Sequence, residues 1–465
     1  MFDILIKNGT VIDGSGARRF RADVAVSDGA VAAIGDLALD DAHEVIDAEG
    51  KFVTPGFVDI NNRSDAYWKI FANPTLDSMA LQGVTTIVGG NSGSSLAPLL
   101  RPEMIKSIQR WIDVSRLNID WQEMDEFLSA VSRRRLSLNF ATLVGHSTLR
   151  RALLGGGDRS LSGEELKVLK AVLRRSLSAG ALGLSAALLY AHSRTTTPEE
   201  LTALAEVVAA EDGILTVYLS DEKEGLLDSL SAKIKVAERT GAKLHISHLK
   251  AVGEKNHHLL EKALKMIIAA RNDGLEITCD VYPYTVMSAV MYTLLPDWIT
   301  DGGRVKMMPR LRDPQLRRKA LAEMRADRTI NFAEAVVSVS PVVKNLSRRR
   351  IGDIAADREQ TPEETIIDLL LAGEGQGMVL IDALGEDGLR AAMREDFCFV
   401  ASNGAGYNLA DRADGENIHP RNFGAFARFL GRYVREEKLL EWEEAIAKIT
   451  SLPARRYGLG ERGIL

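Results

Sequence analysis

Short apolar runs alternate with amphipathic stretches eight times along this chain, and this alternation limits its fold more than any other feature. The runs have the length and residue types of buried strands: VDINN, TTIVGGN, FATLVGH, ALGLSAAL, ILTVYLS, KLHISHLK, EITCDVYP and FCFVASN. Helix-start signals lie between them: a capping box at Ser162 with Glu165, and Thr-Pro pairs at Thr197 and Thr361. Eight strand-helix repeats predict an α/β protein built as a (β/α)₈ barrel.

The chain divides into three parts with different patterns of apolar and polar residues. Residues 1–53 read as short strands, with a hairpin signal at Ser27-Asp28-Gly29, and predict a small β domain. Residues 54–465 carry the strand-helix alternation. Within them, the stretch of about 297–395 separates the last two expected strands and is long enough for an inserted helical lid or subdomain.

Composition excludes several classes of function. The net charge of −6 gives this chain of 465 residues no general attraction to nucleic acid or to an anionic membrane. The start lacks a basic segment followed by a long apolar stretch, and no apolar run reaches 18 residues. Cys279 and Cys398 both lie in apolar runs, which favours buried thiols over a disulfide. These features predict a cytoplasmic protein.

The stretch TPGFVDINNRSD, from Thr54 to Asp65, contains the first barrel strand. Side chains alternate along a strand, so we expect Asp59, Asn61 and Arg63 to share a face at its C-terminal end. This end of a barrel strand is where enzymes of this architecture place their chemistry.

The same stretch resembles the first strand of the amidohydrolase superfamily, whose pattern is PGF-[IV]-D-x-H-x-H. The whole chain is similar to the N-acyl-D-amino-acid deacylases (D-aminoacylases) through the blocks GVTTIVGGNSGSSLAP, TLVGHSTLR, GALGLS, ISHLK, DVYPYT, HPRNFGAF and TSLPARR. The resemblance implies a metal-dependent hydrolase barrel with a small, incomplete N-terminal β-sandwich. It also implies zinc-dependent hydrolysis of the linear amide bond of N-acyl-D-amino acids.

The resemblance also assigns the metal site position by position, and the residues at most of these positions differ from those of the family. The family's metal ligands fall on Asn61, Arg63, Ser92, Tyr218 and His248, its general base falls on Asn403, and an arginine near the fifth strand falls on Ser220. Of the ligands and the base, only His248 keeps the family's residue type.

The replacements do not suit zinc, which binds thiolate, imidazole and carboxylate groups. Arg63 stays protonated, and a divalent ion about 4 Å away would be repelled by about 8 kcal/mol at an effective dielectric constant near 20. Asn403 cannot take a proton from water. We therefore expect no zinc, no other cofactor and no operation of the family's mechanism, which makes the chain a pseudoenzyme.

Positions that hold the substrate in the family are retained: Lys250, Tyr282, Ser288 and Arg421. Arg421 can pair bidentately with a carboxylate, and Arg63 adds a further cation. These residues predict a pocket for a small anion such as an N-acyl amino acid.

Alternatives stay open at this point. The chain could be an active hydrolase of a non-peptide C–N bond with a mononuclear or metal-free site, or Ser92 could form a nucleophile-base dyad with His248. His248 could equally be a hydrogen-bonded pocket histidine, and Tyr282 and Tyr284 could only pack at the barrel rim. Among the other histidines, we expect His245 to pack against helices, and His146 and His419 to orient loops.

In the family, strands from both ends of the chain complete the small sandwich. The expected returning strands, near a PG-x-x-ADLVVF segment, are absent after GLGERGIL. An open sheet edge can pair with a second copy or with a full-length paralogue. The alternative is a truncated product with a thin appendage.

Overall fold

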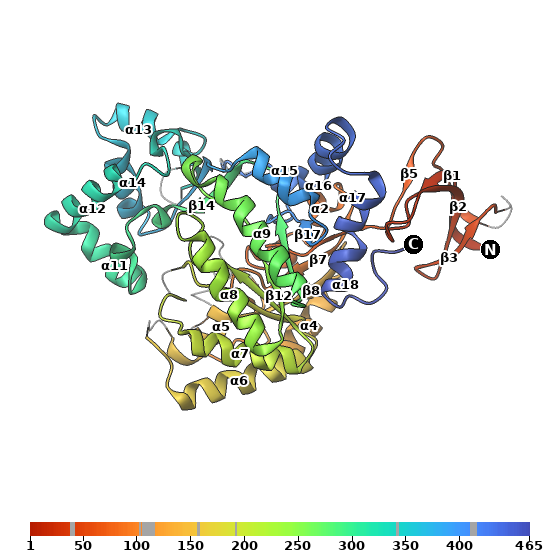
Figure 1. Ribbon diagram of the computed structural model, residues 1–465, viewed down its shortest axis with the longest axis horizontal. Coiled ribbons are helices and arrows are strands. Elements are labelled where there is room, and N and C mark those ends of the chain that lie inside the picture. Colours follow the sequence, from red (N-terminus) through yellow and green to blue (C-terminus); the bar gives the residue numbers. More distant parts are fainter. Residues whose placement is uncertain are drawn as a thin grey trace.

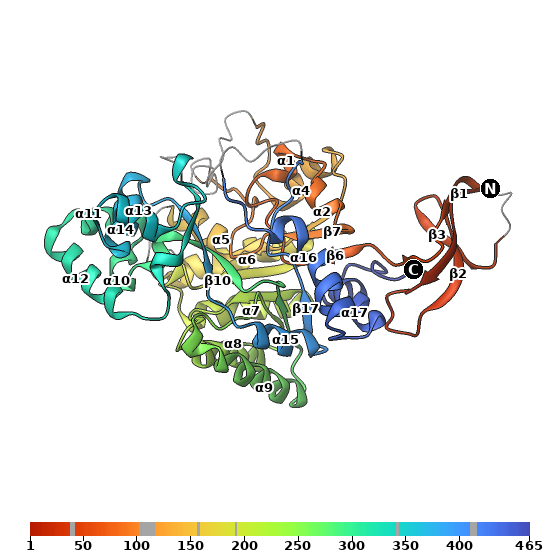
Figure 2. The same cartoon turned by 90° about the horizontal axis from the view of Figure 1, so that it is seen from above.

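The computed structural model describes residues 1–37, 42–101, 104, 117–155, 159–190, 193–340, 344–409 and 416–465. It contains the barrel, a small sheet beyond one side of it and an inserted unit on the opposite side (Figure 1). Figure 2 shows the same arrangement from above, with both chain ends near the small sheet. No helix in the described part of the chain is long and apolar enough to cross a membrane.

The small sheet contains the first five strands: β1 (Phe2–Val11), β2 (Phe20–Ser27), β3 (Ala30–Gly35), β4 (Ala42–Asp47) and β5 (Phe52–Val53). Its order is β3-β2-β1-β4, and β5 also pairs with β1. The expected hairpin is confirmed, because Ser27 pairs with Ala30 and Asp28 and Gly29 both have positive φ angles. The chain end returns to this region, where the amide of Leu465 donates to the carbonyl of Asp13 at 3.0 Å.

All eight expected barrel strands are present and parallel. They are β6 (Phe57–Asp59), β7 (Val84–Gly89), β8 (Asn139–Thr142) with its continuation β9 (Val144–Gly145), β10 (Gly183–Ala187), β11 (Ile214–Tyr218), β12 (Lys243–Ile246), β13 (Ile277–Val281) and β17 (Cys398–Val400). The ring closes between β17 and β6, where the amide of Arg63 donates to the carbonyl of Gly404 at 2.7 Å. The side chain of Asp59 accepts the Ser402 amide at 2.9 Å at the same seam.

Helices surround these strands (Figures 1 and 2). They are α4 (Met124–Ser132), α5 (His146–Leu154), α6 (Gly163–Ser178), α7 (Pro198–Ala210), α8 (Leu226–Thr240), α9 (His258–Asn272), α15 (Glu386–Arg394), α16 (Arg421–Arg428), α17 (Trp442–Ile449) and α18 (Ser451–Arg456). The helix starts predicted at Ser162, Thr197 and Thr361 are confirmed, since each of these side chains accepts a backbone N–H. The largest apolar cluster lies between strands and helices and includes Cys279 and Cys398, which are buried, free thiols.

Two short helices, α1 (Lys69–Ala72) and α2 (Asp77–Ala80), follow the first barrel strand. The unit between β13 and β17 contains strands as well as helices. Its elements are β14 (Val286–Val290), α10 (Asp297–Thr300), α11 (Gly303–Arg312), α12 (Pro314–Ala326), β15 (Val336–Val339), α13 (Ile351–Asp357), α14 (Pro362–Ala372) and β16 (Met378–Asp382).

The three strands of this unit form an antiparallel sheet of order β14-β16-β15 over an apolar cluster of their own. The inserted unit therefore begins before the expected residue 297, because it includes β14. It also ends before the expected residue 395, because residues 386–394 form α15, which contacts α9, β13 and β17 of the barrel.

Candidate active site at the barrel mouth

Three residues just beyond the barrel strands adopt left-handed backbone conformations. The φ angles are 62° at Ser92, 39° at His248 and 48° at Asn403. This region is unfavourable for residues other than glycine, and it persists where the surrounding structure enforces it, most often at functional sites. These three are positions at which the resemblance places metal ligands and the general base. The backbone of the mouth is thus strained where the family would carry out its chemistry.

A chain of hydrogen bonds crosses the mouth through Arg63. Its Nε and Nη2 atoms donate to Oδ1 of Asn403 at 2.8 and 2.7 Å, and Nη2 also donates to the hydroxyl of Tyr218. That hydroxyl lies 2.6 Å from Oγ of Ser92. Burial raises the pKa of Tyr218 well above its usual range, so the phenol keeps its proton, and either hydroxyl can donate in the contact with Ser92. The guanidinium of Arg63 thereby links three of the positions that the resemblance assigns to the metal site.

Beside this chain, Lys250 forms a buried ion pair with Glu222. Nζ of Lys250 lies 2.7 Å from Nδ1 of His248, and Oε1 of Glu222 lies 3.3 Å from the same atom. Burial, followed by the charge of Lys250, lowers the pKa of His248 to about 4, so the ring is neutral at pH 7 and Nδ1 accepts from the ammonium. Burial opposes ionisation of Glu222, yet Lys250 and His248 hold its pKa at about 2.

Two connected chambers open from this site. The inner chamber has a volume of about 80 Å³ and the outer one about 240 Å³. They share Tyr67, Ser288, Met378, Asn403 and Arg421. One wall comes from the inserted unit, through Ser288 of β14 and Met378 of β16, so the ligand space lies between the barrel and this unit.

Arg421 belongs to both chambers and is 8% exposed. Its Cζ lies 5.0 Å from the ring centre of Tyr282, and its Nε has no hydrogen-bond partner among the described residues. The side chain of Arg421 lines both chambers, so a carboxylate bound there would lie beside its guanidinium.

His419 fixes the start of α16, where Arg421 lies. Its Nε2 donates to the carbonyl of Val286 at 2.8 Å, and its Nδ1 accepts the backbone N–H of Arg421 at 3.0 Å. Burial and the charge of Arg421 lower the pKa of His419 to about 3, so the ring is neutral. The loop-orienting role expected of His419 therefore takes the form of a bridge between β14 and Arg421.

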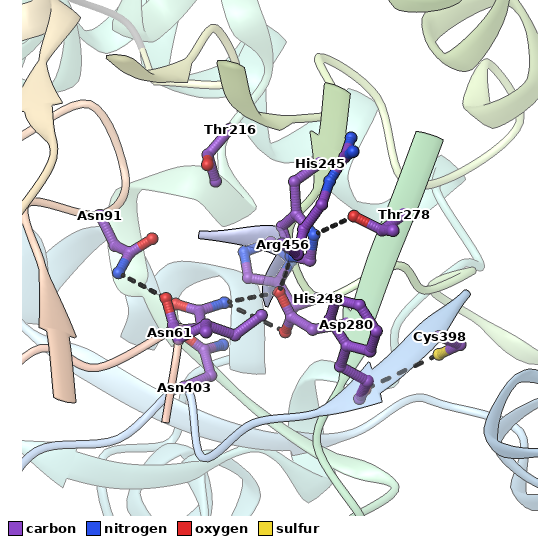
Figure 3. Close-up of polar contacts among 12 residues, drawn as sticks. Asn61, Asn91, Thr216, His245, His248, Thr278, Asp280, Cys398, Asn403 and Arg456 are labelled. Atoms are coloured by element: carbon purple, nitrogen blue, oxygen red, sulfur yellow. Dashed lines mark hydrogen bonds and ion pairs between the residues drawn. The ribbon is translucent and has the colours of Figure 1, made fainter. Parts of the chain in front are cut away.

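Asn61 lies deeper, beside a carboxylate (Figure 3). Its Nδ2 donates to Oδ1 of Asp280 at 3.2 Å, and the other oxygen of Asp280 lies 2.9 Å from Nε2 of His245 (Figure 3). The prediction that His245 packs against helices is therefore wrong. It assumed regular alternation through His248, but β12 ends at Ile246 and His248 turns into the left-handed region.

The structure does not form the Ser92–His248 dyad that was left open as an alternative. Oγ of Ser92 bonds Tyr218, and Nδ1 of His248 accepts from Lys250. The ring of Tyr218 packs edge-on against His248 with centres 3.9 Å apart. Asp59 does not join the mouth either, because it bonds Ser402 and Asn62. Ser220, the family's arginine position, is exposed.

The structure brings most of the predicted residues into one place. The inner chamber is lined by Arg63, Tyr218, His248, Lys250, Tyr282, Ser288, Asn403 and Arg421. Tyr284 instead packs against His419, with ring centres 5.4 Å apart. His146 is buried at the start of α5, where its Nε2 lies 2.8 Å from Glu200.

Three polar residues of the site were missed from the sequence: Glu222, Asp280 and Lys69. Glu222 ends the YLSDE stretch just after β11, and Asp280 lies in DVYPYT near the C-terminal end of β13, so position at the end of a barrel strand could have indicated both. Lys69 carried no such signal, because it comes from α1, well beyond the first strand.

Comparison with known proteins agrees with this geometry. The model of the Amidohydrolase family matches residues 44–465. The chain belongs to this family. It is 32% identical to an N-acyl-D-glutamate deacylase of Alcaligenes xylosoxydans xylosoxydans, an alignment that covers 100% of this chain and 85% of the relative. It is 28% identical to a D-aminoacylase of the same organism, covering 100% and 86%.

Solved structures agree as well. One is an N-acyl-D-glutamate deacylase from Bordetella bronchiseptica, complexed with zinc and a phosphonate inhibitor. It superposes with a TM-score of 0.83 at 29% sequence identity, and the match covers 100% of this chain and 87% of the deacylase chain. A D-aminoacylase structure gives a TM-score of 0.80 at 26% identity, with the same coverage. The (β/α)₈ barrel with an N-terminal β domain is thus the fold of this amidohydrolase, and the relatives named here are N-acyl-D-glutamate deacylases and D-aminoacylases.

The residues at the positions that the resemblance assigns to the metal ligands and the general base do not form a zinc-binding set. Apart from the guanidinium of Arg63, they offer two neutral amides, a protonated phenol, an alcohol and one imidazole already bonded to Lys250. No group of three or more His, Cys, Asp or Glu side chains within the described ranges is arranged to hold a metal ion. The guanidinium of Arg63 donates into the same space and would repel a divalent cation.

Proposed function

We propose that this amidohydrolase binds a small carboxylate of the N-acyl-amino-acid class without hydrolysing it. One observation carries the proposal: the guanidinium of Arg63 bridges Asn403 and Tyr218 in the space where hydrolysis would need a metal and a base. The chambers beside it keep cationic groups for a ligand.

Without a metal, the described residues of this site offer only weak bases to activate water for amide hydrolysis. A bound metal would lower the pKa of water to about 7, and the donor set does not suit one. The amide of Asn403 takes no proton. Glu222, with a pKa of about 2, and His248, with a pKa of about 4, are weak bases at neutral pH. Each would remove a proton from water only at a large energetic cost.

The same site is well suited to binding an anion. The side chain of Arg421 lines both chambers, and the hydrogen bonds of Arg63 across the site go to neutral groups, Asn403 and Tyr218. An anionic ligand would stabilise both buried guanidinium groups through charge-assisted hydrogen bonds. Tyr282 and Ser288 line the same chamber and offer hydroxyls for an acyl amide.

The test combines calorimetric titration, turnover assays and elemental analysis of protein purified without chelator. N-acetyl amino acids of both hands should bind the unaltered protein without release of acetate, and zinc should be far below one ion per chain. Arg421→Met should abolish binding, whereas Arg421→Lys should keep part of it. Near-stoichiometric zinc together with turnover would instead establish an active hydrolase with an altered site.

A restored variant supplies the matched comparison. Five changes rebuild the donor set that the resemblance implies: Asn61→His, Arg63→His, Ser92→Cys, Tyr218→His and Asn403→Asp. We expect this variant to retain zinc and to deacylate N-acetyl-D-amino acids. If it binds zinc stoichiometrically and stays inactive, loss of the metal site does not explain the loss of hydrolysis.

A further inference from the structure

Lys69 lies on the wall of the outer chamber and has no role in the function proposed above. It is the first residue of α1 and is half-buried. It lines the chamber together with Ser288 and Arg421. Its Nζ lies 4.6 Å from the ring centre of Tyr407, an arrangement that holds the ammonium in place without neutralising it.

Among the residues that the structure describes, no carboxylate forms an ion pair with Lys69. Its contact within the described residues is the ring of Tyr407, whereas Lys250 in the inner chamber is paired with Glu222. Glu416 lines the outer chamber as well but forms no ion pair with Lys69 in the described part of the chain. A half-buried ammonium in a chamber of this kind favours a negatively charged occupant.

Among the described residues, the linings of the two chambers carry an excess of positive charge. These residues include four cationic side chains, Arg63, Lys69, Lys250 and Arg421, against two carboxylates, Glu222 and Glu416. A ligand with one carboxylate would neutralise only part of this excess. A ligand with two would match it, provided that its charges reach separate cations.

The positions of Arg421 and Lys69 in the two chambers keep the two cations apart. Arg421 borders both chambers, so a carboxylate paired with it leaves the rest of the ligand free to extend into the outer chamber of about 240 Å³. Lys69 is on the wall of that outer chamber and is not part of the inner one.

We propose that Lys69 selects ligands with a second negative charge, so that the chamber takes the N-acyl derivative of an acidic amino acid, with one carboxylate on Arg421 and the other on Lys69. The assignment rests on the function proposed above, and it adds a specificity-determining residue to it.

Calorimetric titration with N-acetylglutamate and N-acetylglutamine, each in both hands, tests the assignment. The two ligands have nearly the same shape and differ by one negative charge. The unaltered protein should bind N-acetylglutamate about tenfold more tightly, as one charge-assisted hydrogen bond supplies. Lys69→Met should bring the ratio of dissociation constants close to one, and Lys69→Glu should reverse the preference.

The control is Lys262→Met, which removes the same charge from an exposed position on α9 and should keep the tenfold ratio. An unchanged ratio in Lys69→Met, or equal binding of both ligands by the unaltered protein, would overturn the role of Lys69 and leave the proposed function standing. Failure of both ligands and of N-acetylalanine to bind would overturn the proposed function and, with it, this assignment.

Discussion

At the scale of single residues, arginine at position 63 changes the character of the site more than any other replacement. A histidine there could release a proton and bind a metal, whereas a guanidinium stays charged and only donates hydrogen bonds. Its partners are suited to that role, because Asn403 offers a carbonyl oxygen and Tyr218 a hydroxyl oxygen. The replacements at positions 63, 218 and 403 therefore form one hydrogen-bonded unit.

His419 provides a prediction at this scale. Its pKa is about 3 in the folded protein against 6.5 for the free side chain, so the unfolded chain binds the proton first and stability falls as the pH drops from about 6.5 towards 3. Between pH 7 and pH 5, the free energy of unfolding should fall by about 2 kcal/mol more in the unaltered protein than in His419→Gln.

Urea denaturation of both proteins at the two pH values measures this difference. His43→Gln, which changes an exposed histidine in the small sheet, serves as the control and should behave like the unaltered protein. Equal losses in the unaltered protein and in His419→Gln would show that the neutral ring of His419 does not link β14 to Arg421.

At the scale of elements, helix starts follow local chemistry closely. In α6, the hydroxyl of Ser162 accepts the amide of Glu165, and the carboxylate of Glu165 accepts the amide of Ser162 in return. Both bonds involve neighbours in sequence, so the signal that predicted them needed no knowledge of the fold.

Ser162→Ala should accordingly lower the free energy of unfolding by about 1 kcal/mol, because it leaves the amide of Glu165 without its cap. Ser178→Ala, at the exposed last residue of the same helix, should change it by less than about 0.5 kcal/mol. Denaturant titration of the two variants makes the comparison. Equal effects would mean that α6 does not depend on its capping box.

At the scale of the whole molecule, the ligand space depends on two units that fold around separate cores. The barrel supplies Arg63 and Asn403, and the inserted unit supplies Ser288 and Met378. A ligand held between them stabilises the folded state by mass action in proportion to the logarithm of its concentration.

Thermal unfolding tests this dependence. N-acetylglutamate at about one hundred times its dissociation constant should add about 2.7 kcal/mol to the free energy of unfolding and raise Tm by roughly 2–4 °C. The gain should shrink in high salt, because it depends on charge pairing. Arg421→Met should show no shift, and an equal shift in that variant would place the ligand elsewhere.

The barrel, its eight strands and the three helix caps could be predicted from the sequence because each depends on neighbouring residues: apolar runs, capping pairs and strand lengths. The residues at the strand ends could be assigned only through the resemblance to the deacylase family, and the parallel barrel explains why they meet, because it brings all C-terminal strand ends to one mouth. The prediction for the His245 side chain was wrong because side chains alternate only while the strand stays regular, and β12 ends at Ile246.

The sequence by itself determined which groups this amidohydrolase has at its mouth, and hence that the donors for zinc are few. Only the tertiary structure decided what those groups do together. Arg63 and Asn403 are 340 positions apart, Ser92 and Tyr218 are 126 apart, and Lys69 reaches the chamber from a helix outside the strand ends. The physical reason is that hydrogen bonds and charge pairing act over a few ångströms, so they depend on which distant segments the packed barrel and inserted unit bring into contact.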